Sequence, residues 1–258
     1  MRSRASVIDF PFGRTQGRGP EKGTSYSLAE LKHYESQLSA KRKSDGELSN
    51  ELRAAGQGRP RWIKFRNEEL VPLLYYVKHT HTPDDALFRV MPEHNDTDVE
   101  LKVGGATEHL QICVAYPDWA AAGVTQPGQS AGKYHRLMTE ILNRDGGVGV
   151  GPITEKDGVF SQEPRVLSTS ELLSAHTEGL QTALAKKLAK TYHAHPLSLL
   201  VHAVAYRESM SLETFHSVVR NAFVAAKANI EREIHFNEIY VLDSDVGYFV
   251  RLRTLMPW

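Results

Sequence analysis

The segment Asp98-Val99-Glu100-Leu101-Lys102-Val103 alternates polar and apolar residues. Such alternation is typical of a β-strand that packs one face on a core, because successive side chains of a strand point to opposite faces. We therefore expect a polar face that carries Asp98, Glu100 and Lys102, and an apolar face that carries the valines and leucine between them.

A carboxylate and a lysine two residues apart on one strand face can act together on a phosphate group. The carboxylate can bind a hard cation such as Mg²⁺, which proteins hold with one or two carboxylates together with phosphate oxygens. The lysine ammonium, about 7 Å along the strand, can orient a water molecule or stabilise charge that develops on the phosphate. Glu100 and Lys102 thus predict phosphodiester chemistry, which needs a second carboxylate from a neighbouring strand.

The residues Gly104-Gly105-Ala106 predict a tight reversal into a second strand. The simplest register sets Lys102 opposite His109. Glu100 then lies opposite Gln111, at a Cβ separation of about 5 Å. The expected polar patch contains Asp98, Glu100, Lys102, His109 and Gln111, with Cys113 at its edge.

Helical and strand periodicities place this hairpin within a larger fold. Helices are predicted at 27–43, 61–79, 133–144, 170–190 and 211–232, and strands at 86–91, 97–103, 108–116, 195–206, 238–243 and 248–253. The run 195–206 is almost entirely apolar, as expected for a central strand that is covered on both faces. The order predicts an α/β fold with a mixed central sheet, in which a three-strand meander is flanked by helices.

Two short motifs within this order resemble those of the PD-(D/E)XK phosphodiesterases, the superfamily that includes many restriction endonucleases and repair nucleases. They are Pro83-Asp84-Asp85 and Glu100-Leu101-Lys102. The predicted succession of a helix, a three-strand meander, a helix and a strand is similar to the core of that superfamily. The resemblance covers residues 61–116 by motif and 170–253 by element order, and it implies a restriction-endonuclease-like fold.

The resemblance also implies a role for each motif residue. Asp84 or Asp85 would be the first metal ligand, and Asp85 is preferred. Glu100 would be the second ligand, and Lys102 the catalytic lysine. Which aspartate faces Glu100 depends on the strand register, because a slip of one residue reverses the face.

Three further residues complete the candidate site. Glu69, on the preceding helix, would be an additional acidic ligand, and Gln111 is similar to a catalytic glutamine of some members. Asp98, on the polar face of the strand, is the remaining candidate ligand. The implied activity is hydrolysis of DNA by a metal-activated water, with Mg²⁺ as the cofactor and Mn²⁺ as an alternative.

The same polar patch supports an interpretation from another class of protein. Aspartate, glutamate and lysine are ordinary on the solvent side of an amphipathic hairpin, so the alternative is a non-catalytic interaction module on the same α/β scaffold. Zinc is not expected, because the pairs His79-x-His81 and His193-x-His195 lack a third ligand at a recognised spacing.

Composition sets the broad class of the protein. The 258 residues are 41% hydrophobic and 24% charged, which excludes collagen-like, coiled-coil and wholly disordered chains. The single cysteine cannot form an internal disulfide, and no apolar run is long enough to span a bilayer. We therefore expect a cytoplasmic protein without a membrane partner.

The basic and acidic residues are unevenly distributed. Residues 1–66 hold 14 basic and 7 acidic residues, whereas the remainder holds 17 and 24. We expect residues 1–25 to be a flexible basic arm, 26–60 a helix and linker, and 61–258 a single α/β domain with a loop-rich insertion at about 117–165. Such an arm can attract DNA by neutralising phosphates.

Overall fold

The computed structural model of the chain describes residues 23–44, 66–91, 96–118, 153–156, 159–162, 167–204, 210–228, 230–231, 233–244 and 246–253. The chain divides into two compact units. The first comprises the residues up to Ile112 together with His193–Leu200, and the second comprises Cys113–Tyr192 and the residues from Val201 onwards.

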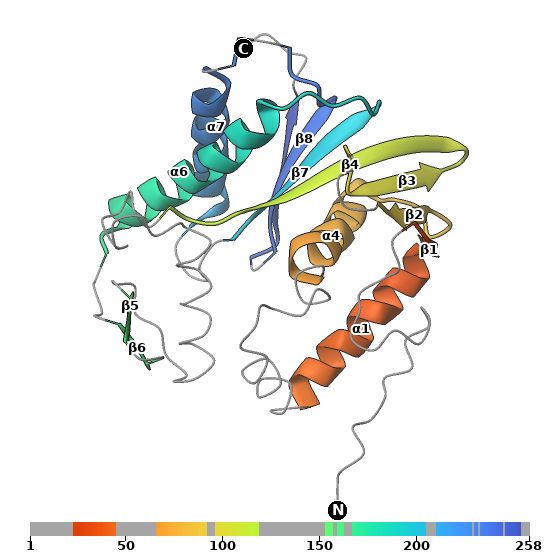
Figure 1. Cartoon of the computed structure of the whole chain (residues 1–258), viewed down its shortest axis with the longest axis horizontal. Coiled ribbons are helices and arrows are strands. Elements are labelled where there is room, and N and C mark those ends of the chain that lie inside the picture. Colours follow the sequence, from red (N-terminus) through yellow and green to blue (C-terminus); the bar gives the residue numbers. More distant parts are fainter. Residues whose placement is uncertain are drawn as a thin grey trace, which may run out of the picture. The chain divides into compact units, whose positions relative to one another are not determined.

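Figure 1 labels the helices and strands of both units. The first unit contains β1 (Ser25–Ser27), α1 (Leu28–Ser44), the π-helical turn η1 (Arg66–Leu70), α4 (Val71–Thr80), β2 (Leu87–Val90), β3 (Val99–Val103) and most of β4 (Ala106–Ala115). The second contains β5 (Ile153–Lys156), β6 (Val159–Gln162), α6 (Thr169–Leu188), α7 (Leu212–Ala228), β8 (Glu238–Asp243) and β9 (Tyr248–Arg253). Strand β7 (Leu197–Ala203) contributes its first part to the first unit and its second part to the second.

Seven strands are hydrogen-bonded in the order β1-β2-β3-β4-β7-β8-β9, and β5 pairs with β6 separately. Neighbours from β1 to β4 are antiparallel. Strands β4 and β7 are parallel, since His109 N donates to Pro196 O in the first unit and Val204 N donates to Ala115 O in the second. The predicted α/β class, with a mixed sheet, a three-strand meander and flanking helices, is confirmed.

Local sequence signals account for most element boundaries. The predicted helices at 27–43 and 170–190 both begin with a capping box, in which a serine and the glutamate three residues later satisfy each other's backbone N–H groups. The predicted helix at 61–79 is α4 preceded by η1, and Pro72 lies in the first turn of α4, where proline is tolerated. Strand β7 is buried along almost its whole length, as its apolar run predicts.

The register of the β3–β4 hairpin differs from the prediction. Glu100 pairs with His109, and Lys102 pairs with Thr107. The pairings of Lys102 with His109 and of Glu100 with Gln111 were therefore wrong. The reason is the turn: Gly104 and Gly105, at φ of 54° and 87°, close a two-residue loop, so the strands pair two residues earlier. Because the shift is two residues, the faces are unchanged.

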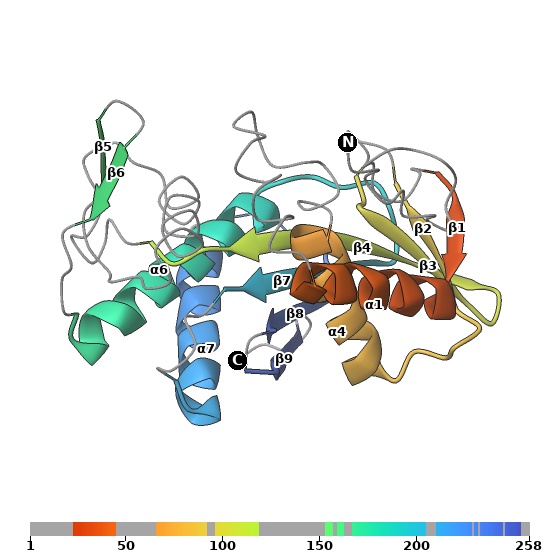
Figure 2. The same ribbon diagram turned by 90° about the horizontal axis from the view of Figure 1, so that it is seen from below.

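The core of the first unit lies on the apolar face of the meander. Helices α1 and α4 lie on one side of β2, β3 and β4 (Figures 1 and 2). The buried side chains of this layer are Leu28, Leu31, Tyr34, Leu73, Tyr76, Val77, Phe88, Val90, Val99, Leu101 and Leu110. Burial of each large apolar side chain contributes about 1.5–3 kcal/mol, so the meander is held with its polar residues on the other face.

In the second unit, α6 crosses the chain that follows β4 at a glycine. Asp118 N donates a 2.8 Å hydrogen bond to Ala175 O of α6. A Cβ built on Gly179 would lie 2.0 Å from Tyr116 O and 3.0 Å from Asp118 N. Only glycine leaves room for this backbone contact.

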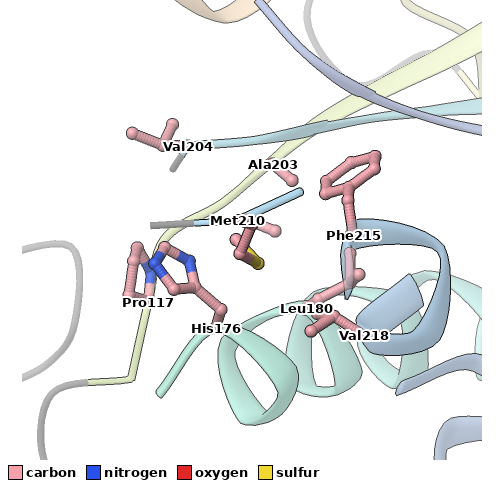
Figure 3. A pocket seen from close by; sticks show the side chains of 9 residues that line it. Pro117, His176, Leu180, Ala203, Val204, Met210, Phe215 and Val218 are labelled. Carbon is pink, nitrogen blue, oxygen red and sulfur yellow. The ribbon is translucent and has the colours of Figure 1, made fainter. Parts of the chain in front are cut away.

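A small apolar cavity lies beside this crossing (Figure 3). It has a volume of about 10 Å³, and the side chains labelled in Figure 3 that line it include those of Pro117, His176, Met210 and Phe215. His176 is 7% exposed, and its burial lowers the pKa from 6.5 to about 4. The imidazole is therefore neutral in the folded protein at pH 7.

Burial of neutral His176 predicts a loss of stability in acid. The unfolded chain takes up this proton below about pH 6.5 and the folded protein only below about pH 4, so the contribution is complete above pH 6.5 and is lost as pH falls between these values. We expect wild type to lose about 2 kcal/mol between pH 7 and pH 5 relative to His176→Met. Urea unfolding at both pH values measures this difference. His216→Gln, at an exposed histidine of α7, should leave the change in the free energy of unfolding between the two pH values as in wild type. If His176→Met shows the same change as wild type, burial of neutral His176 does not cause it.

Several predicted features lie outside the described residues. These are residues 1–22 of the basic arm, the linker at 45–60, the helix at 133–144 and most of the insertion at 117–165. Among the described helices, none combines the length and the apolar character required to cross a bilayer.

Candidate active site

The polar face of the meander carries five side chains from three strands of the first unit, and Asp98 lies just before β3. The pairings of Arg89 with Glu100 and of Glu100 with His109 set these residues side by side. Alternation along β3 and β4 adds Lys102 and Gln111, and Asp98 joins them through the hydrogen bond that Gln111 Nε2 donates to its carboxylate. We call this set the polar strip: Arg89, Asp98, Glu100, Lys102, His109 and Gln111.

Asp98 is the most firmly held carboxylate of the strip. Its Oδ2 accepts hydrogen bonds from Gln111 Nε2 and, at 2.7 Å, from Ile112 N. Its backbone N–H donates to Leu110 O. Gln111 is 6% exposed, so its amide has little freedom. Two donors therefore fix the orientation of this half-buried carboxyl group.

Glu100 is the second residue of β3 and follows Asp98 by two positions. Arg89 Nη1 lies 3.6 Å from Glu100 Oε2, and the Glu100 side chain is 17% exposed. On the other side of Glu100 lies His109, whose Nδ1 is buried and has no hydrogen-bond partner among the residues that the structure describes. Glu100 is thus an ion-paired carboxylate opposite a histidine of the neighbouring strand.

Lys102 lies at the outer end of the strip. Its side chain is exposed, between Leu87 of β2 and Thr107 of β4. A lysine in this position can approach a bound anion from solvent. The structure therefore keeps Glu100 and Lys102 on one face, as predicted. Glu100 is half-buried, and Lys102 is exposed to solvent.

The aspartates of the first motif lie away from the strip. Asp84 and Asp85 are exposed in the turn before β2, and Asp84 Oδ1 is 3.0 Å from Lys32 Nζ of α1. Asp85 precedes Arg89, the residue opposite Glu100, by four positions, which is about 13 Å along an extended chain. The structure does not bring either aspartate to Glu100.

Glu69 lies in η1 and is half-buried. The helix that follows, α4, packs on the apolar face of the sheet. Glu69 therefore lies just before α4, the helix that packs on the face of the sheet opposite the polar strip.

A carboxylate that the sequence analysis missed lies on that apolar face. Glu108 accepts a 2.7 Å hydrogen bond from Ser198 Oγ of β7 and bonds of 3.1 and 3.2 Å from Tyr76 Oη of α4. It is paired with Leu101. The sequence did indicate this carboxylate: Glu108 alternates with Leu110 and Ile112, so it lies on the apolar face of β4, where a charged residue is unexpected. The hydrogen bonds from Tyr76 and Ser198 thus connect α4 and β7 to β4.

The described residues contain no group of three or more histidine, cysteine, aspartate or glutamate side chains arranged to hold a metal ion. The strip supplies two carboxylates, Asp98 and Glu100. This number suits a cation such as Mg²⁺, which retains several waters and takes other ligands from a phosphate substrate, and does not suit a structural zinc site.

The fold and the strip together define an α/β protein with a polar, partly buried patch of opposite charges on one sheet face. Comparisons with protein-family models, curated proteins and solved structures give no match to this chain.

Proposed function

We propose that this protein is a divalent-cation-dependent phosphodiesterase that hydrolyses DNA, with Asp98 and Glu100 as the carboxylates that hold Mg²⁺ or Mn²⁺. The observation that carries the proposal is the fixation of Asp98 by Gln111 and Ile112 just before β3, the strand that bears Glu100. A carboxylate whose orientation is set before a ligand arrives is what a preorganised cation site requires.

The donor set fits the chemistry of a hard cation. When bound, such a cation would supply an activated water at neutral pH and would neutralise phosphate charge. Gln111 positions Asp98, and the exposed cations Arg89 and Lys102 would bind phosphate oxygens of the substrate backbone. Asp84 and Asp85, which lie elsewhere, have no part in this arrangement.

The sheet supports the same proposal at the level of the fold. An antiparallel meander followed by a helix and a strand parallel to the last meander strand agrees with the restriction-endonuclease-like order that the motifs imply. We extend the proposal to that fold and to action in a reducing cytoplasm, where the single cysteine, Cys113, forms no disulfide.

The direct test is incubation of the purified full-length protein with linear, circular and single-stranded DNA. Cleavage is expected with Mg²⁺ or Mn²⁺ and not with EDTA. A folded Glu100→Gln variant should lose the activity, because the amide removes a charged ligand. Absence of cleavage of all three substrates with either metal would contradict the proposal.

A non-catalytic interaction module is the second candidate. The observation that favours it is the Arg89–Glu100 ion pair, which already neutralises one of the two carboxylates. A module of this kind would bind no Mn²⁺ at the strip, and Glu100→Gln would change partner binding rather than cleavage.

A further inference from the structure

We propose that the groove between α1 and α4 binds a small amphipathic monoanion, a monocarboxylate that carries an aliphatic chain. This inference goes beyond the proposed phosphodiesterase function and does not depend on it. It follows from the volume of the groove, from its apolar side chains and from a lysine that has no ionic partner in the part of the chain that the structure describes.

One face of each helix forms the groove, which lies within the first unit. Helices α1 and α4 are neighbours on the same side of the sheet (Figures 1 and 2). The lining positions recur at helical spacing and include 28, 32 and 36 of α1 and 74, 78 and 82 along α4 and its end. The groove opens to solvent and has a volume of about 500 Å³. Sites for small molecules have volumes of about 300–1,000 Å³, so a ligand of this class can be accommodated.

The apolar part of the lining comes from Leu28, Leu74 and Val77. Leu28 and Val77 also belong to the core of the first unit, whereas Leu74 is half-buried. An aliphatic chain in the groove would complete the burial of Leu74. Each Å² of apolar surface removed from water in this way contributes about 25 cal/mol, so the hydrophobic effect favours a ligand with such a chain.

The charged side chains of the groove select a single negative charge. Lys32 Nζ is 3.0 Å from Asp84 Oδ1, so the charge of Lys32 is already compensated. Lys78 is exposed in the last turn of α4 and forms no hydrogen bond or ion pair with any residue that the structure describes. Its ammonium can therefore bind a carboxylate while its methylene groups contact the chain of the ligand. Glu35, which also lines the groove, would repel a second negative charge.

The histidines beside Lys78 indicate a positive environment at this end of the groove. Burial, and next the neighbouring charges of Lys78 and His81, lower the pKa of His79. His81 is exposed and also lines the groove. A bound carboxylate would offset this repulsion between positive charges, so we expect the ligand to raise the pKa of His79.

Calorimetric titration of the full-length protein with decanoate at neutral pH tests the proposal. Wild type should bind one decanoate per chain, and decylammonium, which has the same chain length and the opposite charge, should not bind. Lys78→Gln should weaken decanoate binding about tenfold, whereas Lys78→Arg should stay within about threefold. Lys186→Gln is the matched control, because Lys186 is an exposed lysine in the last turn of α6 in the other unit; it should leave the affinity unchanged.

Two further measurements examine the apolar contact and the position of the carboxylate. Leu74→Asn should weaken decanoate binding at least about fivefold, with circular dichroism to establish that the variant is folded. Nuclear magnetic resonance should show a higher pKa of His79 at saturating decanoate than in the free protein.

Three results would overturn the proposal. The first is decanoate binding to Lys78→Gln as tight as to wild type, and the second is a pKa of His79 that decanoate leaves unchanged. The third comes from sedimentation equilibrium: if wild type is a dimer that Leu74→Asn dissociates, the groove is an interface between two copies of the chain instead.

Discussion

Asp98→Asn is expected to reduce Mg²⁺-dependent DNA cleavage at least about 100-fold. The substitution keeps the size of the side chain and can still accept a hydrogen bond from Ile112 N, but it removes the negative charge that would hold the cation. The measurement is the single-turnover rate of cleavage at saturating Mg²⁺, with Mn²⁺ affinity determined by calorimetry on the same preparations.

Asp96→Asn is the matched control for this experiment. Asp96 lies two residues before Asp98 and accepts a 2.8 Å hydrogen bond from His193 N, so the substitution also removes one charge from a hydrogen-bonded aspartate. Its cleavage rate should stay close to that of wild type. Equal rates for wild type and a folded Asp98→Asn variant would exclude Asp98 as a ligand, and equal losses in both variants would indicate a general effect of charge.

Gly179→Ala is expected to destabilise the protein by about 3 kcal/mol or more. In an ordinary helix interior, glycine to alanine stabilises a protein by about 1 kcal/mol. A decrease in stability would therefore by itself indicate the close contact at Gly179. The added Cβ would lie 2.0 Å from Tyr116 O. The opposing atoms belong to the backbone and cannot rotate away, so the crossing between α6 and the chain after β4 must open.

Urea unfolding followed by far-ultraviolet circular dichroism measures this loss. Thr182→Ala, at an exposed position of the same helix, should change the free energy of unfolding by no more than about 0.5 kcal/mol. A Gly179→Ala protein as stable as wild type would show that the close contact between α6 and Tyr116 is not present in solution.

The fold was predictable where one strong local signal decides an element. Alternation identified β3, a continuous apolar run identified β7, and serine–glutamate pairs marked the starts of α1 and α6. Strand β1 was missed because Ser25–Ser27 is three residues long and mostly polar, so it has no period to detect. Its existence depends on pairing with β2, a tertiary contact that no local pattern encodes.

The candidate site was predicted only in part, for a related reason. Alternation correctly placed Glu100 and Lys102 on one face of β3, because side-chain direction is a local property, whereas Asp98 lies just before the strand. Which residues face them is set by register, and the turn of Gly104 and Gly105, two residues shorter than the loop that the predicted pairing requires, moved His109 opposite Glu100. The partner on the other side, Arg89, is a single exposed residue of a short strand, and nothing in its sequence context indicated it.

The chain order of the first unit has a consequence for biosynthesis. Its last strand segment, from β7, is synthesised some 80 residues after Ile112, when α6 has already been made. Until then β4 exposes a free edge, a site for unwanted association with other nascent chains, and Glu108 lacks its serine donor. The first unit therefore cannot complete its sheet until residues 193–200 have been made, and a fragment that stops before residue 193 would leave the β4 edge unpaired.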